Sequence, residues 1–349
     1  MAKRIYETST VFAFSTDDSD KHEKAHGNPA LIVFADEISV EDKGKITSQA
    51  RISINSEDPV ILPIIDFIRV NDLNKKIFDV EYWLPFREVP VCGHGTIGAV
   101  RAIIDRYGLN DGKEHEYTFN LNTKKFPVNV DFPQLKVKSD GKTFKLEVDD
   151  VTFPEPLSSD DPAFHLIKQE LKGNFIDGTL YFTPLQDYVC VCKDAKQLRN
   201  TVIPVEKLIE LRNIKKEERN YRLFVAMAPS DIEGYDYETT VFSDELPEPV
   251  YKDPACGSAN KEVPKLLRLT KGKTGFFKEK FENDENISHF KMFYPYRFAD
   301  ETAKIKGVKG GVQEVDYDYK NSKITVIGKV SRGKKGTIEI DESENAIFY

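Results

Sequence analysis

The chain has 349 residues, 40% of them hydrophobic and 31% charged, which is typical of a folded globular protein and long enough for two domains. Its net charge of −8 argues against a nucleic-acid partner, because an acidic protein repels a polyanion. No segment reaches the roughly 18 apolar residues of a membrane-spanning helix, and four cysteines are too few for a disulfide scaffold, which indicates the reducing cytoplasm.

The first third of the chain is predicted to consist of strands interrupted by two helices. Alternating polar and apolar residues at the N-terminus predict a strand rather than a signal peptide. The turn GNP leads into the strand ALIVFADE, and a helix capped by Ser39 or Asp42 follows. Two strands, DPVILPIIDFIRV and IFDVEYWLPF, flank a polar turn. The run GHGTIGAVRAIIDRYG has apolar residues at helical spacing and predicts a helix that ends at Gly108.

The rest of the chain repeats this arrangement. Strands and a crossover are predicted for residues 115–155, and strands followed by a helix for TLYFTPLQDYVCVC and KDAKQLRNTVIPVEKLIELRN. Because Cys190 and Cys192 alternate along one strand, we expect both on the same face, packed in the core. Further strands precede a second Cys-Gly turn and helix, DPACGSANKEVPKLLRL. The repeat predicts two related domains, 1–150 and 151–349, with the last strands returning to the first.

The first motif that can carry chemistry is EVPVCGHGTIGA. Glycines on both sides of His94 allow a tight turn, and the helix that follows offers amides near Gly93 that attract a substrate carboxylate. A thiol at Cys92 in this place loses its proton readily and can act as a base. His94 can bind the carboxylate or move a proton. The alternative is a structural turn with a buried cysteine and a hydrogen-bonded histidine.

The second motif is YKDPACGSAN, in which Cys256 takes the place that Cys92 has in the first half. Asp253 can cap the turn, and Gly257 and Ser258 present amides at another helix start. Two facing thiols suit an epimerase, in which one thiolate removes the proton α to a carboxylate and the other thiol returns one. The alternative is a capped turn with a small buried cysteine.

A third candidate, Glu57, lies in ISINSEDPVI between a predicted helix and strand. A lone glutamate in a loop is usually a solvated surface residue. No histidine or carboxylate accompanies His94 at metal-ligand spacing, and neither glycine turn has a nucleotide-binding fingerprint. The sequence therefore predicts neither a metal nor a cofactor.

Together, GNPALIVF, NSEDPVI, EVPVCGHGTIGA, VCVCKDAKQLRNTVIPVEKL and DPACGSAN occur in the order of the phenazine-biosynthesis (PhzF-like) family, which the chain resembles over residues 27–260. The resemblance implies an α+β fold of the diaminopimelate epimerase type. In that fold, two pseudo-symmetric domains each wrap a curved, mainly antiparallel sheet around a central helix. It also implies a homodimer with the active site in the cleft between the domains.

The resemblance assigns roles to individual residues. Glu57 matches the acid–base glutamate of the family and His94 its cleft histidine, while Asp253, Gly257 and Ser258 match its substrate-binding turn. The implied function is a cofactor-independent, biosynthetic isomerase. It would move a proton on a small, amino acid-like substrate that carries a carboxylate.

Two alternatives stay open. Cys256 and the run CGHGTIG also resemble proline racemases and hydroxyproline dehydratases, which implies a two-cysteine epimerase, racemase or dehydratase. A third reading is a binding protein without catalysis, because Asp58 and Pro59 follow Glu57 where the family usually has a small residue and threonine, and the last ninety residues match less well.

Overall fold

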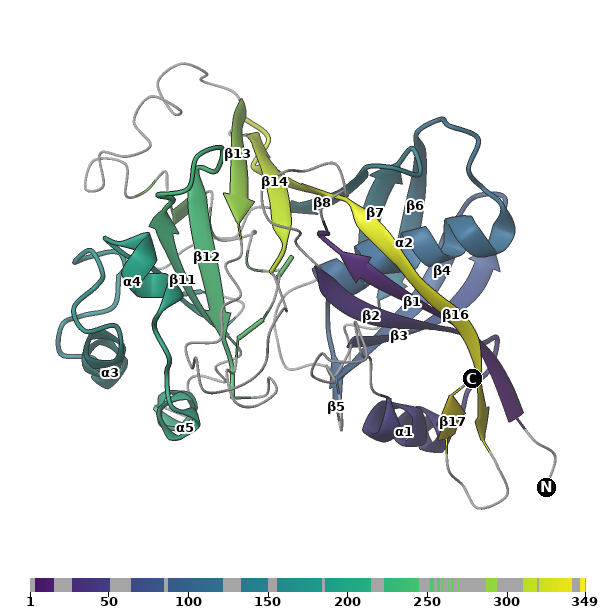
Figure 1. The fold of residues 1–349 in the computed structure, drawn as a ribbon, viewed down its shortest axis with the longest axis horizontal. Coiled ribbons are helices and arrows are strands. Elements are labelled where there is room, and N and C mark those ends of the chain that lie inside the picture. The colour runs from purple at the N-terminus through teal and green to yellow at the C-terminus, as the bar shows by residue number, and fades with distance from the viewer. Residues whose placement is uncertain are drawn as a thin grey trace. The chain divides into compact units, whose positions relative to one another are not determined.

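The structure, a computed structural model, describes residues 4–15, 27–50, 64–84, 87–121, 133–149, 156–183, 186–214, 223–244, 252–253, 256–257, 259, 263, 265–266, 269, 287–293, 310–318, 320–340 and 346–348 (Figure 1). The chain divides into two compact units. Unit 1 comprises Met1–Pro127, Asp131–Glu147 and Ile327–Tyr349, and unit 2 comprises Val128–Val130 and Val148–Val326.

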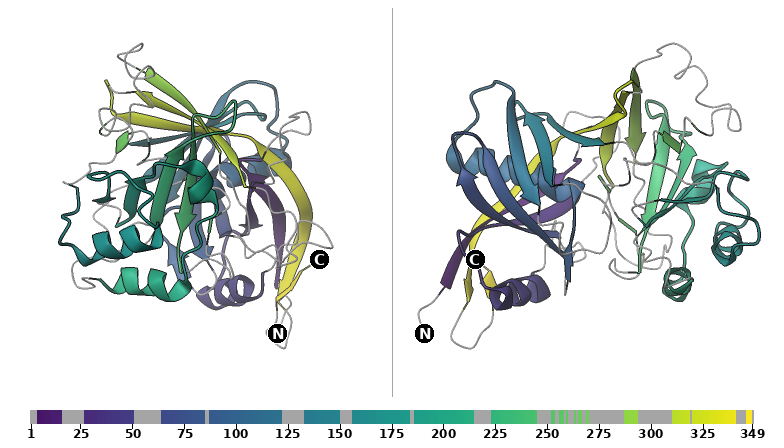
Figure 2. Two further views of the ribbon diagram at one scale, coloured as in Figure 1. Left: turned by 60° about the vertical axis from the view of Figure 1, so that its left-hand side comes forward. Right: turned by 180° about the vertical axis from the view of Figure 1, so that it is seen from behind.

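Unit 1 is a mixed sheet that curves around helix α2 (Gly93–Tyr107), as Figures 1 and 2 show. Its strands are β1 (Arg4–Ala13), β2 (Asn28–Phe34), β3 (Ile64–Asp72), β4 (Ile77–Leu84), β5 (Arg87–Val89), β6 (His115–Leu121), β7 (Gln134–Ser139), β8 (Phe144–Asp149), β16 (Val330–Ile340) and β17 (Ala346–Phe348). The order β17, β16, β1, β2, β3, β4 follows from the strand pairings, in which β2–β3 is parallel and the others are antiparallel.

Helix α2 forms the centre of unit 1 because its side chains are small or apolar on nearly all sides of the helix. Every residue from Gly93 to Ile104 is buried, and the helix contacts β1, β2, β3, β7 and β16. Gly98 allows a close approach to β1, since a Cβ there would lie 2.7 Å from Val11 Cγ2. The helix ends at Gly108, whose φ of 64° is left-handed, so the predicted end is confirmed.

Helix α1 (Val40–Gln49) covers the opposite face of the sheet. Ser39 caps it by accepting a hydrogen bond from the amide of Asp42 at 3.0 Å, which confirms the first of the two predicted caps. Ile46 of α1 joins Ile65 and Phe67 of β3 in one core cluster. Successive residues of a strand point to opposite faces, so Asp66, between these two, points toward α2.

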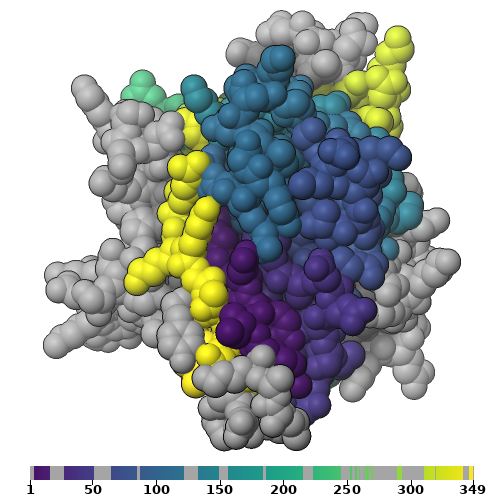
Figure 3. All heavy atoms as spheres, turned by 90° about the vertical axis from the view of Figure 1, so that its right-hand side faces the viewer, coloured from purple at the N-terminus to yellow at the C-terminus, as the bar shows by residue number. Residues whose placement is uncertain are grey.

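The C-terminal strands complete unit 1. Strand β16 pairs along β1 with Arg4 opposite Ile340, and in the space-filling view its yellow atoms lie directly beside the purple atoms of β1 (Figure 3). Asp105, near the end of α2, forms an ion pair with Arg332 of β16 at 2.7 Å. Strand β1 therefore lies between β2 and β16 and is not an edge strand.

Unit 2 pairs its own strands and carries helices on one face (Figure 1). Its elements are α3 (Pro162–Glu170), β9 (Tyr181–Phe182), β10 (Tyr188–Val191), α4 (Ala195–Arg199), α5 (Val205–Asn213), β11 (Phe224–Pro229), β12 (Tyr237–Phe242), β13 (Ile287–Phe293), β14 (Val312–Asp318) and β15 (Lys323–Gly328). Strands β9 to β14 lie side by side in sequence order. Cys190 and Cys192 are fully buried in the core beneath the three helices, which confirms that they share a face.

Two helical features of unit 2 differ from the prediction. Helix α3 occupies residues for which the sequence analysis predicted no helix or strand. Asp161 caps it by accepting from the amide of Ala163 at 2.9 Å, and Pro162 lies in its first turn. One helix was expected after β10, but α4 and α5 are separate, because Pro204 has no N–H to continue a helix and lies at the start of α5.

The helix predicted after the second Cys-Gly turn is present in the residues that the structure describes. Val263, Lys265, Leu266 and Leu269 have helical backbone. Ala259, Val263 and Leu266 are fully buried, as expected for one apolar side of a helix. None of the described helices is long and apolar enough to cross a membrane.

Candidate active site

The amino end of α2 is the better defined of the two predicted turns. The first hydrogen bond within the helix runs from the amide of Thr96 to the carbonyl of Cys92 at 3.0 Å. The amides of Gly93, His94 and Gly95 precede this bond and have no acceptor within the helix. The Cys92 side chain makes no capping hydrogen bond, and the first turn holds no acidic residue. These amides, with the helix dipole, can therefore bind an anion.

His94 lies between the thiol of Cys92 and the side-chain amide of Asn28. Its Nδ1 is 3.3 Å from Cys92 Sγ and 3.3 Å from Asn28 Nδ2. The N–H of Asn28 can donate only to an unprotonated Nδ1, which assigns the proton of the neutral imidazole to Nε2. The structure thus brings two of the predicted site residues together. It adds Asn28, whose signal in the sequence was its place in the turn GNP.

Burial keeps His94 neutral. The ring is enclosed by the first turn of α2 and the sheet, and burial lowers the pKa of His94 from 6.5 to about 3. At neutral pH the imidazole therefore carries no charge. It can donate a hydrogen bond through Nε2–H, but it supplies no positive charge to an anion. An anion at this turn would be held by neutral N–H groups and the helix dipole.

Two hydroxyl groups fix the first turn of α2 against the sheet. Thr96 Oγ1 donates to the carbonyl of Cys92 at 2.6 Å, and the hydroxyl of Tyr82 on β4 lies 2.5 Å from Thr96 Oγ1. Because Thr96 already donates, Tyr82 is the donor to Thr96. Burial raises the pKa of Tyr82 well above its usual range, so this hydroxyl stays protonated and the turn stays anchored.

A buried carboxyl group, that of Asp66, lies beneath the same turn. Asp66 is the third residue of β3 and is fully buried. Neither of its oxygens has a hydrogen-bond partner among the residues that the structure describes. A Cβ on Gly95 would lie 2.7 Å from each of these oxygens, so the carboxyl packs directly against the helix. The sequence prediction missed Asp66, although a single acid in the apolar run VILPIIDFI was a signal.

The second predicted turn lies in unit 2. The amide of Asp253 donates to the main chain of β12 at 2.9 Å, which ties the start of the turn to the sheet. Cys256 and Gly257 are buried. The residue before Asp253, Lys252, is buried as well; burial lowers its pKa to about 8, and its Nζ donates to the carbonyl of Arg199 at 3.3 Å. A buried amine therefore precedes this turn directly.

Glu57 and Ser258, both predicted site residues, lie outside the part of the chain that the structure describes. The remaining predicted residues fall into two groups, one in each unit. Neither Cys92 nor Cys256 is in a disulfide, and the pairing of their thiols stays a prediction. Among the described residues, no three His, Cys, Asp or Glu side chains cluster in the manner of a metal site.

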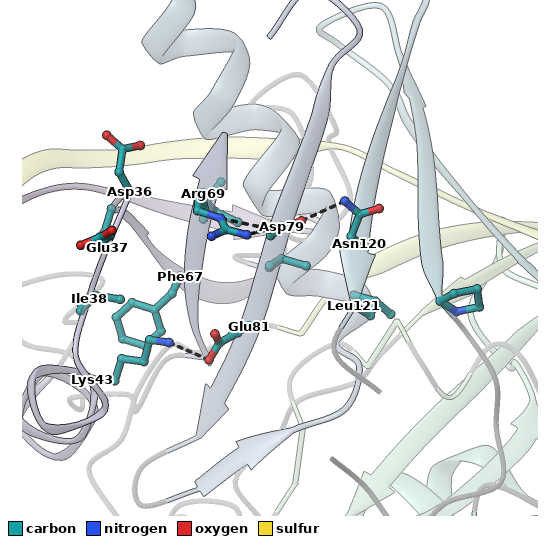
Figure 4. Close-up of a pocket in the computed structure, with 14 residues that line it drawn as sticks. Asp36, Glu37, Ile38, Lys43, Phe67, Arg69, Asp79, Glu81, Asn120 and Leu121 are labelled. Carbon is teal, nitrogen blue, oxygen red and sulfur yellow. Dashed lines mark hydrogen bonds and ion pairs between the residues drawn. The ribbon is translucent and has the colours of Figure 1, made fainter. Parts of the chain in front are cut away.

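A separate pocket of about 580 Å³ lies on the α1 side of unit 1, lined from α1, β3, β4 and β6 (Figure 4). Four of its charged residues form two ion pairs. Lys43 Nζ lies 2.8 Å from Glu81 Oε2 and above the ring of Phe67, and Arg69 forms an ion pair with Asp79. None of the predicted site residues that the structure describes lines this pocket.

Comparisons with known proteins identify the family. The profile of the family described as phenazine biosynthesis-like protein (PhzC-PhzF) matches residues 20–292. No curated protein matches the chain significantly by sequence. A solved putative phenazine biosynthesis PhzC/PhzF protein from Clostridium difficile is similar with 17% identity and a TM-score of 0.63, covering 95% of this chain and 98% of its own. A PhzF-family protein from Bacillus anthracis has 17% identity and a TM-score of 0.63, with coverage of 97% and 99%.

A second group of similar structures belongs to amino acid racemases. A probable proline racemase from Agrobacterium radiobacter K84, solved with bound carbonate, has 12% identity and a TM-score of 0.55, covering 95% of this chain and 92% of its own. These likenesses confirm the α+β, epimerase-type fold that the resemblance implied. Because the family profile spans more than half of the sequence, the chain belongs to the phenazine biosynthesis-like (PhzC-PhzF) family.

Proposed function

We propose that this protein, an isomerase of the phenazine biosynthesis-like family, moves a proton between carbon atoms of a small, amino acid-like substrate that carries a carboxylate. It would do so by acid–base catalysis without a metal or cofactor. The observation that carries the proposal is the amino end of α2, where amides with no acceptor in the helix lie beside the neutral ring of His94.

The carboxylate of the substrate binds at this turn. The amides of Gly93 and Gly95 donate to one side of it, and Nε2–H of His94 donates to another. With its pKa lowered to about 3, His94 does not gain a proton near pH 7. It therefore orients the substrate, and a different group moves the proton.

The family resemblance supports Glu57 as that group. Its carboxylate removes a proton from one carbon and returns it to another, so the substrate is isomerised with no net change in protons or electrons. The family resemblance likewise supports the second turn, with Asp253, Gly257 and Ser258, as the part that binds the remaining polar groups of the substrate. A well-placed acid–base group of this kind contributes roughly 10² to 10⁴ in rate.

Deuterium incorporation tests the proposal. The full-length protein is incubated in heavy water with amino acids, prolines, diaminopimelate and cyclic dienyl acids, and the compounds are analysed by mass spectrometry. Uptake at a ring or allylic carbon, abolished in Glu57→Gln, is the expected result. Glu37→Gln, which removes an exposed carboxylate of unit 1, is the matched control and should retain uptake. Absence of uptake into every compound in the pool counts against the proposal.

A two-thiol epimerase is the second candidate. It is favoured by the place of Cys92 at the amino end of α2, where the helix dipole favours the thiolate. Deuterium would then enter at an α-carbon, and both Cys92→Ser and Cys256→Ser would abolish uptake. Cys190→Ala removes a thiol from the core and serves as the control. Full activity of Cys92→Ser would eliminate this candidate.

The family resemblance also supports a cytoplasmic homodimer. Light scattering on the purified protein measures its mass in solution, and a value equal to one chain would contradict the dimer.

A further inference from the structure

The carboxyl group of Asp66 is a buried acid beside the candidate active site that the proposed function leaves unexplained. It is fully buried, and neither oxygen has a partner in the described part of the chain. A buried polar group without a partner is destabilising, so its presence in a folded protein calls for an explanation. Its position under the first turn of α2, against Gly95, points to that turn.

The charge of this carboxyl decides what the turn can bind. The negative charge of an ionised carboxylate beneath Gly95 would offset the positive potential at the amino end of α2 and repel a second anion. A protonated carboxyl is neutral and leaves that potential for a ligand. The turn is suited to a substrate carboxylate only in the second state.

The surroundings of Asp66 support the neutral state. It faces Gly95 of α2, and its strand neighbours are Ile32 of β2 and Tyr82 of β4. The ionisable groups of the turn above it are Cys92 and His94. Burial keeps both Tyr82 and His94 uncharged at neutral pH, and burial raises the pKa of Asp66 itself. None of the groups named here supplies a positive charge that would hold a carboxylate.

We propose that Asp66 is a positioning residue that holds one proton at neutral pH and thereby keeps the amino end of α2 open to the carboxylate of the substrate. The inference rests on the proposed function, in which α2 binds that carboxylate. When Asp66 loses its proton at higher pH, the same turn rejects the anion. Asp66 therefore sets an upper pH limit on carboxylate binding without touching the substrate.

Alkylation of Cys92 by two matched reagents tests the proposal without any substrate. Iodoacetate carries a carboxylate and iodoacetamide is neutral, and both react with the same thiolate. Their rate ratio at Cys92 therefore cancels the titration of the thiol and reports the electrostatic potential at the turn. The ratio is measured on the full-length protein by peptide mass spectrometry between about pH 5 and pH 10. We expect the ratio to fall about tenfold as Asp66 ionises.

Neutral replacements of Asp66 define the expected result. In Asp66→Asn, the rate ratio of iodoacetate to iodoacetamide should stay at its low-pH value over the whole pH range. Asp66→Leu has an apolar side chain suited to a buried position and should give the same result, so it replaces Asp66→Asn if the amide impairs folding. Asp72→Asn removes a carboxylate from the partly exposed end of the same strand and should keep the wild-type profile.

Three results would overturn the inference. One is a ratio in the wild-type protein that does not change with pH. Another is the same fall in both neutral variants as in the wild type. The third is the absence of alkylation of Cys92 by either reagent, because the turn would then be closed to a small carboxylate. Each is independent of deuterium uptake, so failure here and failure of the proposed function are distinguished.

Discussion

The part of the sheet formed by β3 and β4 has carboxyl groups on both faces. Those on one face are in ion pairs, whereas the one on the other face is buried without a partner among the described residues. On the α1 side, Glu81 is paired with Lys43, and Asp79 is paired with Arg69 (Figure 4). On the α2 side, Asp66 is fully buried and has no partner among the described residues. Carboxyl groups on opposite faces of two neighbouring strands thus lie in very different environments.

The difference separates a structural use of carboxyl groups from a functional one. Paired, partly exposed charges contribute little to stability and tolerate substitution. An unpaired buried acid costs stability, and such groups are concentrated at functional sites. The comparison therefore favours the α2 face as the place of the ligand site that we propose for unit 1. The predictions below test this assignment, from the largest expected effect to the smallest.

Substitution of His94 should have the largest effect. His94→Leu removes a donor from the proposed carboxylate site and should lower the rate of deuterium uptake about 10²-fold or more. His94→Gln keeps a neutral N–H donor, so the rate of deuterium uptake should fall less than in His94→Leu. Glu81→Gln, on the α1 face, should leave uptake unchanged. Equal losses in the variants of the two faces would contradict the assignment.

Gly95→Ala should be the most destabilising small change on the α2 face. The new Cβ would lie 2.7 Å from both oxygens of Asp66, and overpacking of this kind costs about 1–3 kcal/mol. Gly44→Ala is the matched control, because nothing lies within 4 Å of its Cβ position and alanine favours the helix by about 0.5–1 kcal/mol. Urea denaturation measures both. If Asp66→Ala fails to restore part of the loss in Gly95→Ala, the clash lies elsewhere.

The pH dependence of stability should reveal two opposing contributions on the α2 face. The pKa of Asp66 is raised from 3.8, so its contribution to the free energy of unfolding is present below pH 3.8 and is lost as pH rises through the folded-state pKa. The pKa of His94 is lowered from 6.5 to about 3, so its contribution is present above pH 6.5 and is lost as pH falls toward 3.

Single variants should separate these contributions. Relative to the wild type, Asp66→Asn should gain stability as pH rises, and His94→Leu should gain stability as pH falls. Urea denaturation between about pH 4 and pH 8 measures both differences. Variant curves that run parallel to the wild-type curve would show that neither group has a shifted pKa.

The smallest effect is expected on the α1 face. Glu81→Gln breaks the ion pair with Lys43, whose side chain is 10% exposed against 28% for Glu81. We expect the free energy of unfolding to fall by about 1 kcal/mol, and by less at high salt. Thermal denaturation at two ionic strengths checks this. If the free energy of unfolding fell much more in Glu81→Gln than in Gly95→Ala, the comparison of the two faces would be reversed.

Much of the fold was predictable from the sequence because its signals are local. The cap at Ser39 and the left-handed end of α2 at Gly108 were predicted from the types of residue at the ends of the two helices. Helix α3 was missed although Asp161 and Pro162 form a typical start, because the residues just before it are polar. The break at Pro204 was overlooked because the apolar spacing continues across it.

The site was predictable only where its residues are neighbours in sequence. Cys92 and His94 are two residues apart and were found together. Asn28 and Asp66 reach the same turn from β2 and β3, and their approach depends on strand register and on the curvature of the sheet around α2. Neither can be derived from one sequence. The role of Glu57 rests on family resemblance.

The return of the chain to unit 1 has a consequence for its biosynthesis. Strand β1 leaves the ribosome before unit 2 is made, but its partner β16 is made only after unit 2. During translation one side of β1 therefore stays without its final partner, which makes it a site for pairing with other nascent chains. Unit 1 therefore begins to form before unit 2 but is completed after it. Premature termination of translation before β16 would leave the edge of β1 permanently unpaired.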